Sequence, residues 1–287
     1  FYHQKMQLFA LFYKLFFIGN RRFHPQVQRM IKLNTNENPY PPAPGVIRAL
    51  KEFDTDRLRL YPEPACKVLV DAIAEYYGLK SSQVFVGVGS DDVLAMIFMT
   101  FFNSKTPIWF PDITYSFYDV WADMLRIPYE VKPLDDNFQI VKEDYYGENG
   151  GVVFPNPNAP TGILMPLSEI EDIIKHNQDV IVVVDEAYID FGGESALPLI
   201  EKYDNLLVVQ TFSKSRSMAG MRIGYAMGNE KLMDTAGMTN GLTVSMFFYS
   251  VLLAPIGEEL LFRGVTMHQA KKVFPFWAAN IMQALLF

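Results

Sequence analysis

Short apolar runs recur along the middle of the chain at the spacing of an alternating strand–helix fold. They occupy residues 84–88, 106–110, 151–154, 180–184 and 206–209. Runs of this length are typical of strands buried on both faces of a parallel sheet. Residues 66–77 instead carry apolar side chains at helical spacing, which predicts a helix with one buried face. The order of these elements predicts an α/β fold with a mainly parallel sheet and helices on both faces.

Both ends of the chain differ from this middle part. Residues 1–19 are apolar and aromatic, but Lys5 and Lys14 interrupt them. The stretch is too short and too broken for a membrane span, which favours an amphipathic helix. Residues 242–256 are nearly free of charge. We therefore predict three parts: an apolar arm over 1–30, a main domain over 31–236 and an apolar helical segment over 237–287.

Composition limits the function further. The chain has 287 residues, 50% of them hydrophobic, so it can bury one large core or two modest ones. A net charge of −7 without a basic stripe argues against a nucleic-acid partner. The one cysteine, Cys66, excludes a disulfide framework within the chain and fits a reducing compartment such as the cytoplasm. We expect Cys66 to be a small core residue.

A lysine stands just past the last of these apolar runs, in the stretch TFSKSRSMAGMRIGY at residues 211–225. Flanked by hydroxyls and small residues, Lys214 suits a pocket better than a core; the alternative is an exposed loop lysine with an arginine nearby. The spacing of Ser-Lys, then Gly, then Arg-x-Gly-Tyr resembles the cofactor-lysine region of fold-type I pyridoxal-phosphate aminotransferases. This resemblance implies that Lys214 forms a Schiff base with the cofactor aldehyde, while Ser213 and Arg222 hold the cofactor phosphate.

An acid follows directly after the run at 180–184. A carboxylate at the carboxyl end of a central strand lies where open α/β sheets bind ligands, and a buried acid must be paired or hydrogen-bonded. A protonated pyridine nitrogen would be such a partner, and Asp185 matches the aspartate of the same family. Tyr188 matches the family tyrosine near the phenolic oxygen of the cofactor.

Two motifs resemble one branch of this family. Residues 33–39 read Leu-Asn-Thr-Asn-Glu-Asn-Pro, which resembles the opening motif of histidinol-phosphate aminotransferases, where this arm helps close the substrate site. The alternative is a proline-rich linker. Tyr61 precedes Pro62 and matches a family tyrosine that reaches the cofactor phosphate across a dimer interface, so the resemblance implies a homodimer.

Residues 84–92 are interpreted as a strand, a glycine turn and the start of a helix. Glycines let the backbone approach an anion, and the amides of a helix N-terminus suit a phosphate. Ser90 or Asp91 could equally be a plain N-cap. The likeness to the family's Gly-Ser-Asp-Glu motif, with Asp92 at the position of the glutamate, favours phosphate binding by Ser90, Asp91 and Asp92.

Two further candidates follow strand-like runs. Tyr115 matches the family tyrosine that stacks on the cofactor ring, although an isolated aromatic would more often be a core residue. Residues 156–162, Asn-Pro-Asn-Ala-Pro-Thr-Gly, resemble the family's Asn-Pro-Thr-Gly signature, whose asparagine binds the phenolic oxygen. Since Ala159 directly precedes Pro-Thr-Gly, Asn158 is the expected substitute. A turn built by Asn and Pro is compatible with the same residues.

The resemblance covers residues 31–233 and implies pyridoxal 5'-phosphate as cofactor, with no metal. The implied reaction moves an amino group from histidinol phosphate to 2-oxoglutarate, which yields imidazole acetol phosphate and glutamate in histidine biosynthesis. Its small-molecule substrates are thus an amino donor and a 2-oxo acid, and its catalytic residues are Lys214, Asp185 and Tyr188. Two alternatives stay open: a decarboxylase acting on a phosphorylated amino acid, and an inactive core that is truncated or fused to a membrane-protease fragment.

The resemblance stops near Met233. The family's small domain, with an arginine that grips the substrate, is not recognisable beyond it, so we expect weak cofactor binding and poor turnover. Residues 258–264, Glu-Glu-Leu-Leu-Phe-Arg-Gly, resemble the first motif of the CPBP family of intramembrane proteases. This resemblance implies membrane association through 242–287, and the alternative is an amphipathic helix with an ordinary ion pair.

Overall fold

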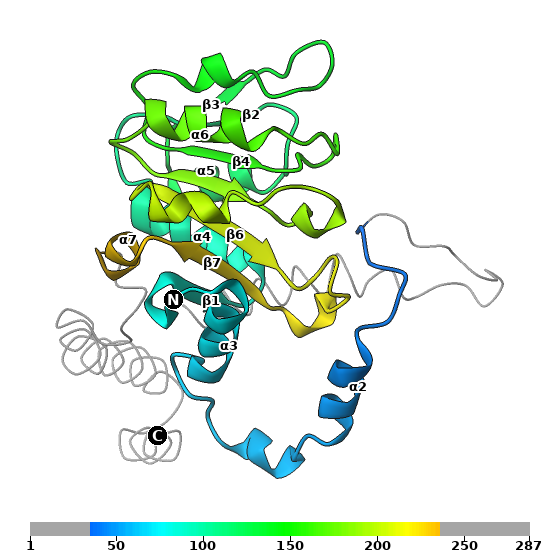
Figure 1. Cartoon of the computed structure of the whole chain (residues 1–287). Coiled ribbons are helices and arrows are strands. Elements are labelled where there is room, and N and C mark those ends of the chain that lie inside the picture. Colours follow the sequence, from blue (N-terminus) through cyan, green and yellow to red (C-terminus); the bar gives the residue numbers. More distant parts are fainter. Residues whose placement is uncertain (1–34, 236–287) are drawn as a thin grey trace, which may run out of the picture. The chain divides into compact units, whose positions relative to one another are not determined.

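A seven-stranded sheet is the centre of the structure, a computed structural model that describes residues 35–235 (Figure 1). The strand order is β1-β7-β6-β5-β4-β2-β3, and neighbours are parallel except that β7 is antiparallel to β1 and β6. The strands are β1 (Val84–Gly87), β2 (Ile108–Pro111), β3 (Tyr129–Lys132), β4 (Val152–Pro155), β5 (Val182–Asp185), β6 (Leu206–Thr211) and β7 (Gly224–Gly228). The mainly parallel α/β sheet predicted from the apolar runs is confirmed.

Helices cover both faces of this sheet. Those that pack on the sheet are α3 (Lys67–Tyr77), α4 (Ser90–Phe101), α5 (Tyr118–Leu125) and α6 (Leu167–His176). The other described helices are α2 (Pro44–Lys51), which has no buried residue, and α7 (Glu230–Thr235). Val182 and Val184 of β5 belong to the hydrophobic cluster formed with α3 and α6, whereas Val183 belongs to the cluster formed with α4 and α5. This alternation follows from the period of two in a strand, and it explains why the run is apolar throughout.

Helix α6 illustrates how the sequence forms these layers. Ile170, Ile173 and Ile174 lie at the i, i+3 and i+4 positions and are all fully buried. Burying such a side chain contributes about 1.5–3 kcal/mol relative to leaving it exposed. Acidic and basic residues occupy the other side of the helix, where Glu171 lies 3.6 Å from Lys175. The pattern of one apolar stripe therefore fixes which side of α6 faces the sheet.

Element boundaries differ from the sequence pattern by one or two residues. The run at 180–184 enters the sheet only at Val182, because the Val180 amide donates to the Asn177 carbonyl (3.1 Å) in the turn after α6. The prediction for Cys66 was wrong. This cysteine is exposed just before α3, with a left-handed backbone (φ 49°), because it lies near the end of a segment that has no buried residue.

That segment comprises residues 39–68, which carry α2 and the 3-10 helix η3 (Thr55–Arg59). None of its side chains is buried, and it stands away from the sheet in Figure 1. Leu58 and Tyr61 are 72% and 101% exposed. The rest of the described chain therefore provides no core for this segment.

The predicted arm at 1–30 and the predicted apolar segment at 237–287 lie outside the described residues. Among the helices of residues 35–235, none combines the length and the apolar character that crossing a membrane requires.

Candidate active site

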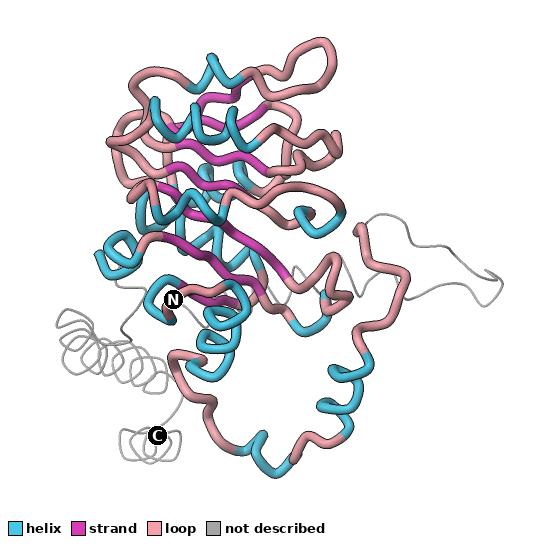
Figure 2. The backbone as a smooth tube through the Cα atoms, in the orientation of Figure 1, coloured by secondary structure: helices cyan, strands magenta, loops and turns pink. Residues whose placement is uncertain are grey.

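The loops that follow β4, β5 and β6 meet at one edge of the sheet, because these strands are parallel (Figure 2). Asp185 is the last residue of β5 and is only 4% exposed. The Tyr118 hydroxyl donates to its Oδ2 at 3.0 Å, and the Ala187 amide donates to its Oδ1 at 3.1 Å. Burial raises the pKa of Asp185 to about 6, against the lowering effect of these two donors. A desolvated carboxylate in this setting favours a cationic partner.

A second group joins the loop after β2 to the start of α4 and to the residues before β7. The Tyr115 hydroxyl donates to Oδ1 of Asp91, and Nη2 of Arg222 lies 3.3 Å from Oδ2 of the same carboxylate. Burial, aided by Asp91, raises the pKa of the Tyr115 hydroxyl well above its usual range, so this group remains a donor. Asp91 thus holds both an aromatic ring and a guanidinium in place.

Glycines allow β7 and the start of α4 to approach closely. A Cβ on Gly224 would lie 2.2 Å from the Ser90 amide nitrogen, and one on Gly89 (φ +93°) would lie 2.5 Å from Nη2 of Arg222. The Arg222 guanidinium therefore lies against the turn that precedes α4. Asp92 shapes the same turn, since its Oδ2 accepts a hydrogen bond from the Val88 amide at 2.9 Å.

Lys214 lies in the loop after β6, as the sequence indicates. Its Nζ is 5.3 Å from the centre of the Tyr188 ring. On one side of the lysine, Thr211 Oγ1 lies 3.0 Å from the Ser213 hydroxyl and accepts from the Ser213 amide at 3.2 Å. The lysine's own carbonyl accepts a hydrogen bond from Asn38 Nδ2 at 3.0 Å. The end of the 33–39 motif therefore contacts the lysine loop directly.

Asn158 is buried between two loops, with 3% of it exposed. Its Nδ2 donates to the Ile113 carbonyl at 3.0 Å, and its Oδ1 accepts from the Thr114 hydroxyl at 3.1 Å. These bonds tie the loop after β4 to the loop that carries Tyr115. The amide therefore fixes the position of that aromatic side chain.

The candidates from sequence fall into three sets. Contacts within the site join Asp91 to Tyr115 and Arg222, and Lys214 to Tyr188. A third set consists of residues whose hydrogen bonds go to neighbours that are not themselves candidates: Asp92, Asn158, Asp185 and Ser213. Tyr61 lies in the exposed segment at 39–68 and contributes nothing to the site of its own chain. Residues 35–235 contain no cluster of three metal-ligating side chains.

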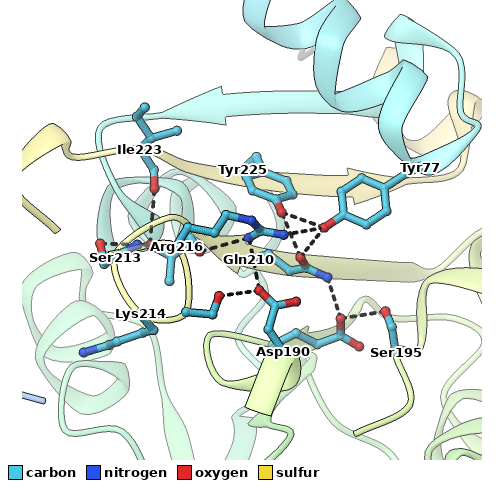
Figure 3. A network of polar contacts seen from close by, with 12 residues as sticks. Tyr77, Asp190, Ser195, Gln210, Ser213, Lys214, Arg216, Ile223 and Tyr225 are labelled. Atoms are coloured by element: carbon cyan, nitrogen blue, oxygen red, sulfur yellow. Dashed lines mark hydrogen bonds and ion pairs between the residues drawn. The ribbon is translucent and has the colours of Figure 1, made fainter. Parts of the chain in front are cut away.

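Sequence reasoning missed a polar network behind the lysine loop (Figure 3). Its centre is Arg216, whose Nη2 donates to the Tyr77 hydroxyl at 2.9 Å and whose Nη1 lies 3.5 Å from Oδ2 of Asp190. The Tyr77 hydroxyl in turn donates to Oε1 of Gln210 at 2.7 Å. Tyr77 comes from α3, Gln210 from β6 and Asp190 from the short helix η6 (Ile189–Phe191), whereas Arg216 lies in the loop after β6. No spacing along the chain indicates that they meet.

Glu186 joins this network through Gln210. It is 1% exposed, and Gln210 Nε2, the Ser195 hydroxyl and the Ala196 amide donate to it at 2.6 to 2.8 Å. Burial raises the pKa of Glu186 to about 7, although these donors oppose the shift. Glu186 thus accepts hydrogen bonds from three neutral protein donors, whereas the adjacent Asp185 accepts from two.

The site fits the cofactor that the resemblance implies. Asp185 is a buried carboxylate whose two hydrogen-bond donors are neutral, which suits a protonated ring nitrogen. Gly89 has no side chain and lies next to the N-terminus of the 12-residue helix α4 and to the Arg222 guanidinium. This setting suits a phosphate. The two features belong to one site, because Tyr115, which donates to Asp91, packs its ring 5.6 Å from that of Tyr118, which donates to Asp185.

The fold and this arrangement fit the class of pyridoxal-phosphate-dependent aminotransferases. The family of class I and II aminotransferases matches residues 28–262, and the chain belongs to this family.

Two relatives show which branch of this family the chain resembles. Histidinol-phosphate aminotransferase 1 of Hydrogenovibrio crunogenus is 58% identical over 210 residues, which cover 73% of this chain and 59% of that protein. The histidinol-phosphate aminotransferase of Lactococcus lactis subsp. cremoris (strain MG1363) is 51% identical over 238 residues, 82% of this chain and 67% of that protein. The chain therefore spans about three fifths to two thirds of the length of these relatives.

Solved structures share the fold. The histidinol-phosphate aminotransferase of Sinorhizobium meliloti, in complex with pyridoxal-5'-phosphate, has a TM-score of 0.66 at 20% identity and covers 88% of this chain and 78% of that one. The L-threonine-O-3-phosphate decarboxylase of Porphyromonas gingivalis has a TM-score of 0.58 at 22% identity, covering 67% and 58%. The fold alone thus accommodates both transamination and decarboxylation.

A second family matches the other end of the chain. Residues 240–287 match the type II CAAX prenyl endopeptidase Rce1-like family. This is the segment whose sequence resembles an intramembrane protease, and it lies outside the described residues.

Proposed function

We propose that this chain provides the cofactor-binding part of a pyridoxal-phosphate-dependent aminotransferase that moves an amino group from histidinol phosphate to 2-oxoglutarate. The observation that carries the proposal is the placement of Asp185 and Lys214 at the carboxyl ends of the adjacent parallel strands β5 and β6. Relatives named histidinol-phosphate aminotransferase at 58% and 51% identity support the substrate. The proposed domain covers residues 31–236.

In this proposal the phosphate is held at the start of α4 by Ser90 and by Ser213 and Arg222. Asp91 acts through Tyr115 and Arg222, which it already contacts. The ring of Tyr115 packs on the flat cofactor ring. Asn158 and Tyr188 are proposed to bind near its phenolic oxygen, and a cofactor contact of Asp92 stays a prediction.

When bound, pyridoxal phosphate supplies an aldehyde that binds amines and a ring that withdraws electrons from the substrate carbon. Asp185 holds a proton on the ring nitrogen through its negative charge. With the cofactor bound, the Lys214 amine would take a proton from the substrate carbon and hold it at Nζ for return. Tyr188, whose ring is 5.3 Å from Nζ, orients this amine.

A homodimer is part of the proposal. Tyr61 is 101% exposed in a segment with no buried side chain, which suits a residue that completes the site of a second copy. Membrane association through 242–287 is a separate prediction, which cosedimentation of the chain with lipid vesicles tests.

The experiment that tests the proposed function is covalent capture of the cofactor. We expect borohydride to fix pyridoxal phosphate to Lys214 in the purified protein, giving a mass increase on the peptide that contains this residue. Lys214→Ala should abolish the capture, and Lys202→Ala, which removes another loop lysine, should leave it unchanged. Equal capture by Lys214→Ala would refute the assignment.

Product analysis separates the related reactions. With histidinol phosphate and 2-oxoglutarate, the proposal predicts glutamate in amounts equal to the substrate consumed. Release of carbon dioxide from a phosphorylated amino acid instead would favour a decarboxylase, as in the Porphyromonas gingivalis protein of the same fold. Capture of the cofactor with neither product would favour an inactive core.

A further inference from the structure

Arg216 follows Lys214 by two residues, yet its side chain turns away from the lysine into the network of Figure 3. Its Nη1 donates to the carbonyl of Thr211 at 3.3 Å and lies 3.5 Å from Oδ2 of Asp190. Its Nη2 donates to the Tyr77 hydroxyl at 2.9 Å. One side chain thus connects the lysine loop to the end of β6, to η6 and to α3.

Aromatic rings surround this guanidinium on other sides. The carbon Cζ of Arg216 lies 5.0 Å from the centre of the Phe212 ring and 5.9 Å from that of Tyr225. Only 25% of the arginine side chain is exposed. A planar guanidinium with five fixed donors can stack on rings and bond several acceptors at once, which a flexible ammonium cannot do.

The bonds on both sides of Lys214 make a closed turn. The Ser217 amide donates to the Lys214 carbonyl at 3.2 Å, and the Met218 amide donates to the Phe212 carbonyl at 3.0 Å. Arg216 lies inside this turn, and its bond to Thr211 draws the turn back onto the residue where β6 ends. The backbone position of the lysine therefore depends on a side chain that does not itself face the cofactor groups.

From this geometry we infer that Arg216 is a positioning residue, which holds the turn 212–218 so that the Lys214 amine reaches the reacting carbon. The chemical part of the inference rests on the proposed function of Lys214. A lysine side chain has four rotatable bonds, so its reach is defined only when its backbone is held. A displacement of about 1 Å can lower a rate about 100-fold.

Hydrogen exchange in the cofactor-free protein tests the holding directly. We expect Arg216→Ala to accelerate exchange of the Ser217 and Met218 amides at least tenfold, and Arg216→Lys to give an intermediate increase. Amides of β4 and β5 should not change. As a matched control, Lys67→Ala removes a cation that is 71% exposed and paired with Asp71 on α3, and it should leave the turn unaffected.

Two results of this exchange experiment would overturn the inference. One is unchanged exchange at Ser217 and Met218 in Arg216→Ala. The other is an equal acceleration in β4 and β5, which would show that the arginine supports the whole fold and has no particular effect on the turn. Neither result depends on whether the protein binds pyridoxal phosphate.

Kinetics with the loaded protein tests the consequence for Lys214. Arg216→Ala should slow borohydride-captured attachment of pyridoxal phosphate and lower kcat about 100-fold, with a smaller change in KM and partial rescue by Arg216→Lys. An unchanged attachment rate and kcat in a variant with a loosened turn would reject the positioning role. Absence of capture in the parent protein would count against the proposed function alone, and the exchange result would then decide the inference.

Discussion

At the scale of single residues, the ionised carboxylate of Asp185 destabilises the folded protein when no cation is bound beside it. Burial raises its pKa to about 6 from an ordinary value of 3.8, so the folded protein binds this proton more tightly than the unfolded chain does. Its contribution to stability is present below about pH 4 and is lost as the pH rises through about 6. Urea unfolding should therefore show that Asp185→Asn stabilises the cofactor-free protein by about 1–3 kcal/mol at pH 8 and not at pH 4.

The same substitution should slow transamination by orders of magnitude, because the amide cannot hold the proton on the ring nitrogen. The fold should survive, since the Tyr118 hydroxyl can accept a hydrogen bond from the new amide nitrogen. Asp136→Asn, in an exposed loop, is the control and should change neither quantity. Equal stability of Asp185→Asn and parent at pH 8 would contradict the burial effect, and a near-normal rate would contradict the catalytic role.

At the scale of elements, the junction of β7 with α4 depends on the absence of one side chain. A Cβ on Gly224 would lie 2.2 Å from the Ser90 amide nitrogen and 2.3 Å from the Gly89 carbonyl carbon, both backbone atoms that cannot move alone. We expect Gly224→Ala to destabilise the fold by about 1–3 kcal/mol and to weaken pyridoxal phosphate binding by displacing the start of α4. Thermal unfolding and a cofactor titration measure the two effects.

A second glycine provides the comparison for this element. Gly220 has no atom within 4 Å of where its Cβ would lie. Gly220→Ala should therefore be neutral or stabilising, by up to about 1 kcal/mol, because it restricts the unfolded chain. Similar losses in both variants would show that the close approach at Gly224 is not what limits the junction.

At the scale of the whole molecule, the segment at 39–68 exposes apolar side chains that the rest of residues 35–235 does not cover. Leu58 and Leu60 are 72% and 56% exposed, and contiguous exposed apolar surface marks interaction sites. If a second copy covers this segment, the double substitution Leu58→Asp and Leu60→Asp should convert dimer to monomer in sedimentation equilibrium. Phe138→Asn, which removes another exposed apolar side chain (54%), should leave the dimer intact. A parent protein that is already monomeric would refute the dimer.

Local patterns were enough to predict the strands that are buried on both faces. The apolar runs ending at Phe110, Phe154, Val184 and Val209 correspond to β2, β4, β5 and β6 within one or two residues, because strands buried on both faces are mostly apolar. Two strands lack this signal. The outermost strand β3 is largely exposed and contains two charged residues, and β7 is Gly-Tyr-Ala-Met-Gly, whose glycines carry no hydrophobic pattern.

By itself the sequence determined which residues stand at the ends of the strands, since Asp185 and Lys214 follow apolar runs that must enter the sheet. Only the tertiary structure decided their partners: Tyr115 meets Asp91 across 24 positions, and Arg216 meets Tyr77 across 139. Such pairs have no fixed spacing, because they depend on how whole helices and loops pack against the sheet. For the same reason a sequence pattern can name the lysine, but the arginine that holds its loop is visible only after folding.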